Sequence, residues 1–96
     1  MTTVRQLIDR EEKWARGVFA RDKGGRICDP CDVAACCWCL AGGLKACYPG
    51  DEFSVAENAV KGACRRLYGT LNYMVWQDSR YATWRMVKRL LREAGV

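Results

Sequence analysis

The sequence predicts a mainly α (α+β) fold, a small bundle of about four helices with one short β-hairpin. Three observations predict it. The chain has 96 residues, enough for a single domain over residues 1–96 with one small core. Apolar residues recur at helical spacing in several segments. Gly24-Gly25 lies between two short segments and is typical of a tight turn.

The N-terminal segment predicts a helix followed by a hairpin. Thr3 and Gln6 have the spacing of a capping box, in which two side chains satisfy backbone N–H groups reciprocally. We therefore expect a helix over residues 4–14 that ends before Gly17. Residues 18–28 then predict two short strands joined at Gly24-Gly25, because glycine readily adopts the positive φ of such turns.

The next segment is small and apolar. A helix is expected to begin at Asp29-Pro30 or Asp32, because proline is tolerated in a first turn. It would run through residues 33–40 to Gly42-Gly43 or slightly beyond. Since this segment is apolar nearly all round, it predicts the buried central helix.

The second half of the chain predicts two more helices. After a turn at residues 48–51, Ser54 and Glu57 form a second capping box that opens a helix ending at Gly69. The residues of this helix expected to face inward are Val55, Ala59, Val60, Ala63, Cys64, Leu67 and Tyr68. Residues 72–76 are expected to be an extended connection.

The last helix is expected to begin at Asp78 or Ser79, either of which can cap it. Its inward stripe would be Ala82, Trp84, Val87, Leu90, Leu91 and Ala94. Its outer face would carry four cations: Arg85, Lys88, Arg89 and Arg92.

The positive charge is concentrated in the last third of the chain. The 16 basic and 11 acidic side chains give a net charge of +5. Residues 1–60 hold eight basic and nine acidic side chains, a net of −1, whereas residues 61–96 hold eight and two, a net of +6. Such asymmetry favours an anionic partner. The outer face of the last helix therefore predicts a nucleic-acid interface, with an ordinary solvated face as the alternative.

Composition excludes several mechanisms. The chain has no histidine, which excludes Ser-His-Asp and Cys-His catalysis and Cys2His2 zinc sites. Neither GxxxxGK[ST] nor GxGxxG occurs. No secretory signal is recognised, and the longest apolar stretch is too short to cross a bilayer. We expect a cytoplasmic protein with reduced thiols, no membrane partner and no catalytic turnover.

Seven cysteines raise the question of a metal. Four of them have the form C-x2-C-x4-C-x2-C, a pattern that would suit zinc, namely Cys28, Cys31, Cys36 and Cys39. The central spacing is short and the usual knuckle glycine is missing. Free cysteine also packs as a small apolar residue. No cofactor is expected, with zinc in a protein-interaction module as the alternative. The same Cys28-x-x-Cys31 pair would also suit a redox motif, although the rest of such a fold is missing.

Unlike side chains in two segments predict a pocket for an anion. Arginine presents a planar fork to phosphate or carboxylate, and a tryptophan ring stacks on a base. The candidates are Arg21, Asp22, Arg26, Trp76, Asp78 and Arg80. Alternatively, these arginines and aspartates form ordinary ion pairs around core tryptophans. The two carboxylates would suit acid–base or divalent-metal chemistry if they met, which the sequence does not indicate.

Three blocks together resemble a known family. They are Leu7-Ile8…Trp14-x-x-Gly17-x-Phe19-Ala20-Arg21-Asp22-x-x-Gly25-Arg26, then Val33-x-x-x-x-Trp38-Cys39-x-x-Gly42, then Trp76-x-Asp78-x-Arg80. The chain resembles small uncharacterised proteins of actinobacteria, other bacteria and their phages. The resemblance implies a compact helical domain and adds weight to the pocket. Gln77 stands where relatives usually have asparagine, and the histidine expected after Arg80 is missing, so any histidine chemistry of relatives is absent here.

These observations lead to one functional hypothesis with two alternatives. The hypothesis is a phage-related binding protein of the bacterial cytoplasm that sequesters an anionic, nucleotide-like signal in counter-defence, without turning it over. A homo-oligomer would enlarge the pocket of so short a chain. The alternatives are a nucleic-acid-binding protein that uses the last helix, and a zinc-stabilised interaction module.

Overall fold

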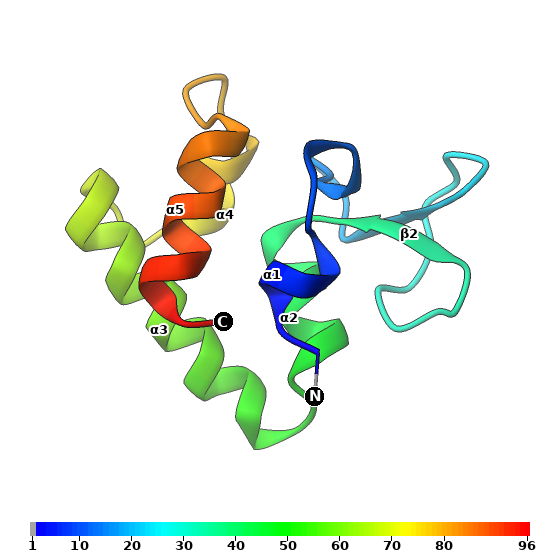
Figure 1. Cartoon of the computed structure of the whole chain (residues 1–96), viewed down its shortest axis with the longest axis horizontal. Helices are drawn as coiled ribbons and strands as arrows, with labels where there is room; N and C mark the ends of the chain where they lie inside the picture. The colour runs from blue at the N-terminus through cyan, green and yellow to red at the C-terminus, as the bar shows by residue number, and fades with distance from the viewer. Residues whose placement is uncertain (1) are drawn as a thin grey trace.

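The computed structural model describes residues 2–96 and confirms the mainly α (α+β) class (Figure 1). The helices are α1 (Val4–Leu7), α2 (Leu40–Cys47), α3 (Asp51–Tyr68), α4 (Tyr73–Asp78) and α5 (Trp84–Ala94), with a short 3₁₀ helix at Glu11–Lys13. The strands β1 (Ala20–Asp22) and β2 (Ala35–Trp38) form one antiparallel two-stranded sheet. No helix within residues 2–96 is long and apolar enough to cross a membrane.

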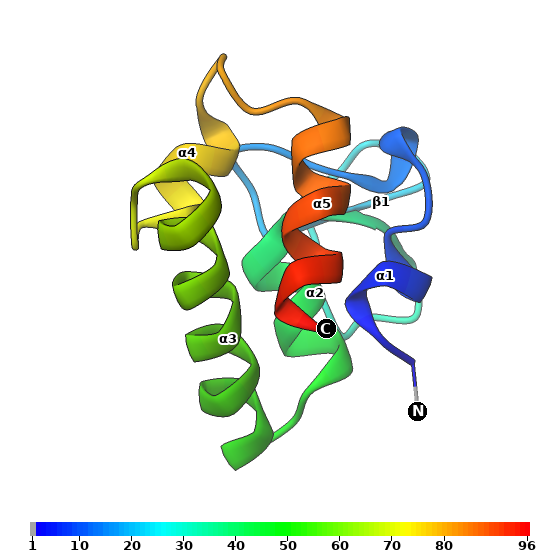
Figure 2. The same ribbon diagram turned by 60° about the vertical axis from the view of Figure 1, so that its left-hand side comes forward.

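Helix α5 lies beside α3 on one side and α1 on the other (Figure 2). Its inward residues Val87, Leu90 and Leu91 are at most 1% exposed, as the helical spacing predicted. They meet the buried face of α3, which includes Val60 and Ala63. This α3–α5 pair is the larger part of the helical core.

Helix α2 is buried, and its two glycines let the backbone come close to neighbouring segments. A Cβ on Gly42 would lie 2.9 Å from the carbonyl carbon of Phe19 and collide with its oxygen. A Cβ on Gly43 would lie 3.1 Å from both Val4 and Ile8 of the N-terminal segment. Position 42 therefore requires glycine, because the backbone of Phe19 occupies the space that a side chain would take.

The N-terminal helix is shorter than predicted. The capping box is confirmed, because the Gln6 N–H donates to Thr3 Oγ1 (3.2 Å) and the Thr3 N–H donates to Gln6 Oε1 (2.9 Å). The helix nevertheless ends at Leu7, not near residue 14. Beyond it the chain turns so that Trp14 forms a bridge to Trp38 and donates its Nε1–H to Gln77. These long-range contacts override the local helical pattern.

The glycine turn is confirmed, but β1 has a different main partner from the one expected. Gly25 has a φ of 82°, and the Asp22 N–H donates to the Arg26 carbonyl at 2.8 Å. Residue Ile27, in the segment expected to pair, makes only an isolated bridge with Arg21. The strand that pairs with β1 is β2, with Ala20 opposite Trp38 and a bulge after Arg21.

The prediction of a helix that begins at Asp29 or Asp32 is wrong over residues 29–39. This segment contains turns and β2 instead. Asp29 Oδ1 accepts a hydrogen bond from the Cys31 N–H, and Asp32 Oδ1 accepts one from the Ala34 N–H, each at 2.8 Å. Such local turns compete with helix formation. The helix starts only at Leu40, after Cys39, whose Sγ accepts from the Gly42 N–H.

Helix α3 begins three residues before the predicted capping box. Gly50, with a φ of 60°, precedes its first residue, Asp51. Glu57 does not cap the helix, because its carboxylate accepts a hydrogen bond from Tyr73 Oη (2.7 Å) and pairs with Lys61. Val55, expected to face inward, is 73% exposed. Gly69 ends the helix in the left-handed region, as predicted.

The segment between α3 and α5 is helical and not extended. Asn72 caps α4 by accepting from the Val75 N–H at 3.2 Å. Asp78 ends α4 and does not cap the last helix. The cap of α5 is Thr83, whose Oγ1 accepts from the Met86 N–H at 3.3 Å.

Candidate functional site

The structure uses Arg21 and Asp22 to hold the turn after β1. Asp22 Oδ1 accepts hydrogen bonds from the N–H groups of Gly24 (2.9 Å) and Arg26 (3.0 Å). The Arg21 guanidinium donates to the Gly25 carbonyl at 2.8 Å. The side chain of Arg26 is exposed. These three residues lie together, and two of them serve the turn itself.

The second group of candidates lies at the end of α4. Trp76 is 9% exposed, and its ring stacks on Tyr68 with 4.6 Å between ring centroids and 8° between planes. Asp78 Oδ1 accepts from the Gly17 N–H at 3.0 Å and from the Gln77 side chain. Arg80 is exposed and its guanidinium lies over the Tyr81 ring, 5.2 Å from the centroid. The Trp76 ring is therefore part of the core.

The six residues form two groups that are neighbours in sequence, the turn after β1 and the end of α4. No hydrogen bond or ion pair between residues 2–96 joins the Arg21–Arg26 turn to the end of α4. Each carboxylate is tied to a backbone N–H, that of Asp22 within its own turn and that of Asp78 at Gly17. The Arg/Trp/Asp pocket stays a prediction.

The seven cysteines are free thiols. Cys39 is buried and caps α2, and the Cys31 thiol donates to the Lys45 carbonyl at 3.6 Å. Burial raises the pKa of Cys28, Cys39 and Cys47, the last to about 11, which favours the neutral thiol over the thiolate that binds metals. Within residues 2–96 no three His, Cys, Asp or Glu side chains are grouped to hold a metal ion.

The central polar residue that sequence reasoning did not assign is Gln77. It is fully buried, and its Oε1 accepts hydrogen bonds from Trp14 Nε1 (2.8 Å) and from the Leu40 N–H (3.2 Å). Its Nε2 donates to the Ala15 carbonyl at 3.4 Å. One amide thus joins the N-terminal segment, α2 and α4. In the sequence, Gln77 is a lone amide that follows Trp76. That position by itself does not show that the Gln77 side chain is buried.

The outer face of α5 carries the charge that the sequence predicted for it. Arg85, Lys88, Arg89 and Arg92 follow the spacing of a single helical face and are all exposed. We call these four residues the basic stripe. The ion pairs within residues 2–96 involve other side chains, on Asp9, Glu57 and Glu93. The stripe is therefore a row of cations without acidic partners within 4.0 Å.

Two hollows border the basic stripe. The larger, about 410 Å³, is lined by Tyr68, Arg85, Met86, Arg89 and Arg92. Tyr68 is held there because its Oη donates to the Met86 carbonyl at 2.8 Å. The smaller, about 170 Å³, is lined by Arg5, Ile8, Asp9, Trp84, Lys88, Leu91 and Arg92. Arg92 borders both.

The electrostatics of the stripe suit an extended polyanion. Asp9, the acidic residue of the smaller hollow, pairs with Lys13 (3.3 Å) and Arg10 (3.4 Å), and these hydrogen-bonded cations lower its pKa. Its charge is thus already compensated by basic neighbours. The four stripe cations follow the axis of α5, so they match a row of phosphates better than one compact anion.

The fold and this surface define a small mainly α protein with a basic terminal helix. The chain belongs to a family of unknown function (DUF6197), whose model matches residues 1–95. No match is found among curated proteins or among solved structures.

Proposed function

We propose that this protein binds nucleic acid through the basic stripe of α5. The observation that carries the proposal is the exposure of four cations on one helical face with no acidic partner within 4.0 Å. Like charges side by side on a helix destabilise it. A phosphate backbone would neutralise them and release its own counterions on binding.

The surroundings of the stripe support the same function. Tyr68 and Trp84, both half-buried, line the two hollows on either side of the cations. Aromatic rings beside a basic groove are typical of surfaces that bind single strands. The phosphate contacts alone carry no sequence information, so the proposed binding is of low sequence specificity.

The test compares binding to a fluorescently labelled oligonucleotide, single-stranded and duplex, by anisotropy at two salt concentrations. The stripe variant carries Arg85→Gln, Lys88→Gln, Arg89→Gln and Arg92→Gln. Since each phosphate contact contributes about 0.9 to the slope of log K against log salt on duplex DNA, loss of the four stripe cations should reduce that slope by about 3.6. Affinity at low salt should fall at least about tenfold.

A matched control removes four exposed cations elsewhere: Lys23→Gln, Arg26→Gln, Lys45→Gln and Arg80→Gln. It has the same net charge as the stripe variant, so it separates a local interface from general charge attraction. Equal loss of binding in both variants, or no binding by the natural chain at low salt, would contradict the proposal.

The same control variant tests the hypothesis of an anionic ligand. Arg26 and Arg80 are the exposed arginines of the predicted Arg/Trp/Asp pocket. If the protein sequesters a nucleotide signal, as the resemblance to phage proteins led us to expect, a cyclic nucleotide should raise the melting temperature of the natural chain. That shift would be lost in the control variant and kept in the stripe variant.

A further inference from the structure

The outer face of α3 combines exposed side chains with an unusual order of charges. Asp51, Val55, Asn58, Gly62 and Arg65 recur at helical spacing on the side of α3 opposite its buried residues, and all but Gly62, which is half-buried, are exposed. We call these five residues the α3 stripe. Val55, at 73% exposed, is an apolar side chain without a partner in the chain.

The charges of α3 are self-complementary when the helix is reversed. Its first nine residues carry three acidic and no basic side chains, and its last nine carry three basic and no acidic ones. Acids near the N-terminus and bases near the C-terminus also suit the helix dipole. The dipole does not account for the exposed Val55, nor for a glycine within the helix.

Gly62 is not required by the packing within the chain. An added Cβ would meet only the end of the Arg66 side chain, at 3.5 Å, and no backbone atom. Glycine within a helix is less stable than alanine. A small residue at this place would instead allow a second helix to approach closely from outside.

We propose that α3 pairs with α3 of a second copy of this chain, antiparallel, about a two-fold axis near Asn58 and Ala59. In this register Val55 lies against the partner's Gly62, and Asp51 lies opposite the partner's Arg65. The two-fold axis repeats both contacts. Neither Asp51 nor Arg65 takes part in an ion pair within residues 2–96, so both charges are available.

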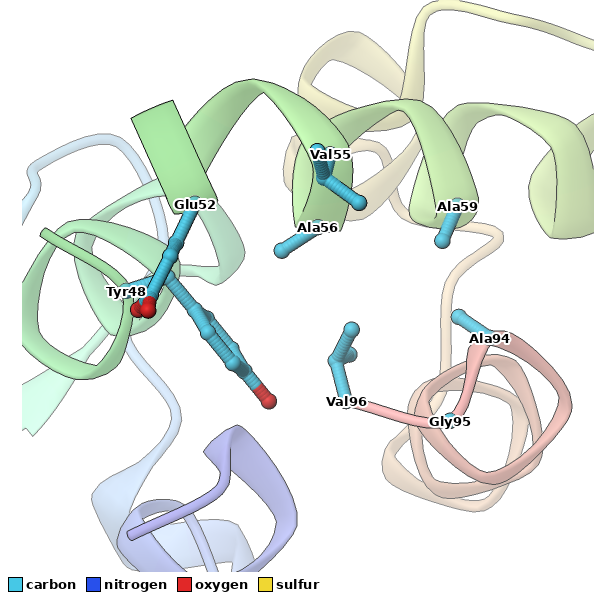
Figure 3. A pocket seen from close by; sticks show the side chains of 8 residues that line it. All are labelled: Tyr48, Glu52, Val55, Ala56, Ala59, Ala94, Gly95 and Val96. Carbon is cyan, nitrogen blue, oxygen red and sulfur yellow. The ribbon is translucent and has the colours of Figure 1, made fainter. Parts of the chain in front are cut away.

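A groove beside the α3 stripe adds apolar surface to the proposed interface. It has a volume of about 370 Å³ and lies between the first half of α3 and the C-terminal end of α5. Figure 3 shows Val55 and Ala59 of α3 on one wall and Ala94 and Val96 on the other, with Tyr48 at one end. Val55 borders both the groove and the stripe. Because one helix pair buries less than a standard interface, we expect association in the micromolar range.

The test is sedimentation velocity of the full chain over a concentration series. The chain has a mass of 10.9 kDa, and we expect a concentration-dependent shift from monomer to dimer. Asp51→Arg or Arg65→Glu alone places like charges opposite each other twice and should raise the dissociation constant at least about tenfold. The double variant Asp51→Arg/Arg65→Glu should restore it.

Two further variants keep the test decisive. Lys23→Glu, an exposed charge reversal far from α3 in sequence, should leave the dissociation constant unchanged. Gly62→Ala should make the isolated chain more resistant to urea and yet weaken the dimer, which an effect on folding alone would not do. A monomer throughout the series, or no rescue by the double variant, would overturn the proposal. The α5 basic stripe is intact in every variant, so nucleic-acid binding is tested separately.

Discussion

Gly42 shows how one atom decides a packing arrangement. The Cα of Gly42 lies against the backbone of Phe19, and an added Cβ would lie 2.9 Å from the Phe19 carbonyl carbon. The same carbonyl accepts a hydrogen bond from the Cys39 N–H at 3.1 Å. The contact thus joins the start of α2 to the residue before β1, and there is no flexible side chain to move aside.

We expect Gly42→Ala to lower the free energy of unfolding by about 2–3 kcal/mol, since overpacking against backbone forces the elements apart. Urea denaturation measures it. Gly24→Ala is the matched control, because both changes restrict the unfolded chain equally, and a Cβ at Gly24 would meet only Asp22 Oδ1 at 3.5 Å. Similar stabilities for the two variants would show that α2 can shift away from Phe19.

Cys47 gives the molecule a pH dependence in the alkaline range. Its side chain is 8% exposed, and burial raises the pKa of its thiol from 9.0 to about 11. The folded state therefore favours the neutral thiol. Its contribution to stability is complete below pH 9 and is lost as the pH rises toward 11.

We expect the free energy of unfolding to fall by up to about 2 kcal/mol between these pH values on account of Cys47. Chemical denaturation at pH 8, 9, 10 and 11 measures the fall. It should be smaller in Cys47→Ala, which has no group to titrate. Parallel pH profiles of the two proteins would contradict this assignment. Burial also raises the pKa of Tyr73, which adds a loss at higher pH that both proteins share.

At the scale of the elements, Gln77 joins parts of the chain that are far apart in sequence. Its amide oxygen accepts from both Trp14 Nε1 and the Leu40 N–H. We expect Gln77→Leu to lower the free energy of unfolding by about 2–4 kcal/mol, because it leaves one buried and one part-buried donor without an acceptor. Thermal and urea unfolding measure it. Asn72→Leu, which removes the cap of α4 without breaking this network, should cost about 1 kcal/mol. A loss for Gln77→Leu no larger than that would contradict the role of the network.

The elements also show which local patterns predict structure well. The Thr3–Gln6 capping box and the inward residues of α5 were predicted correctly, since both depend on neighbours within one helix. The prediction of a helix over residues 29–39 was wrong, because a short apolar run fits a strand as well as a helix. The turns at Asp29 and Asp32 and the pairing with β1 decide in favour of the strand.

At the scale of the whole molecule, the net charge of +5 is unevenly placed, and the basic stripe concentrates four positive charges on α5. Salt screens their mutual repulsion over about 10 Å at 0.1 M. We expect the melting temperature to rise by a few degrees between low salt and about 0.3 M NaCl. The rise should be smaller in the stripe variant than in the control lacking Lys23, Arg26, Lys45 and Arg80. Equal rises would show that the stripe does not dominate the repulsion.

The candidate site, like the fold, has one part that depends on local sequence spacing and one part that depends on how distant segments meet. The basic stripe was predicted as a set, because four cations at helical spacing share a face whatever the helix packs against. The Arg/Trp/Asp pocket required two segments to meet. In the structure, Asp22 accepts hydrogen bonds from its own turn, and the Trp76 ring stacks on Tyr68. The partners of Asp22 and Trp76 therefore do not come from the segment that the pocket prediction placed opposite each of them.

The sequence by itself determined the mainly α class, the face of α5 that is buried, the cations opposite it and the end of α3 at Gly69, because these depend on periodicity and local backbone geometry. Only the tertiary structure decided the strand that pairs with β1, the burial of Gln77 and the exposure of Val55. Those outcomes depend on which distant segments occupy the neighbouring space, and no local pattern carries that information.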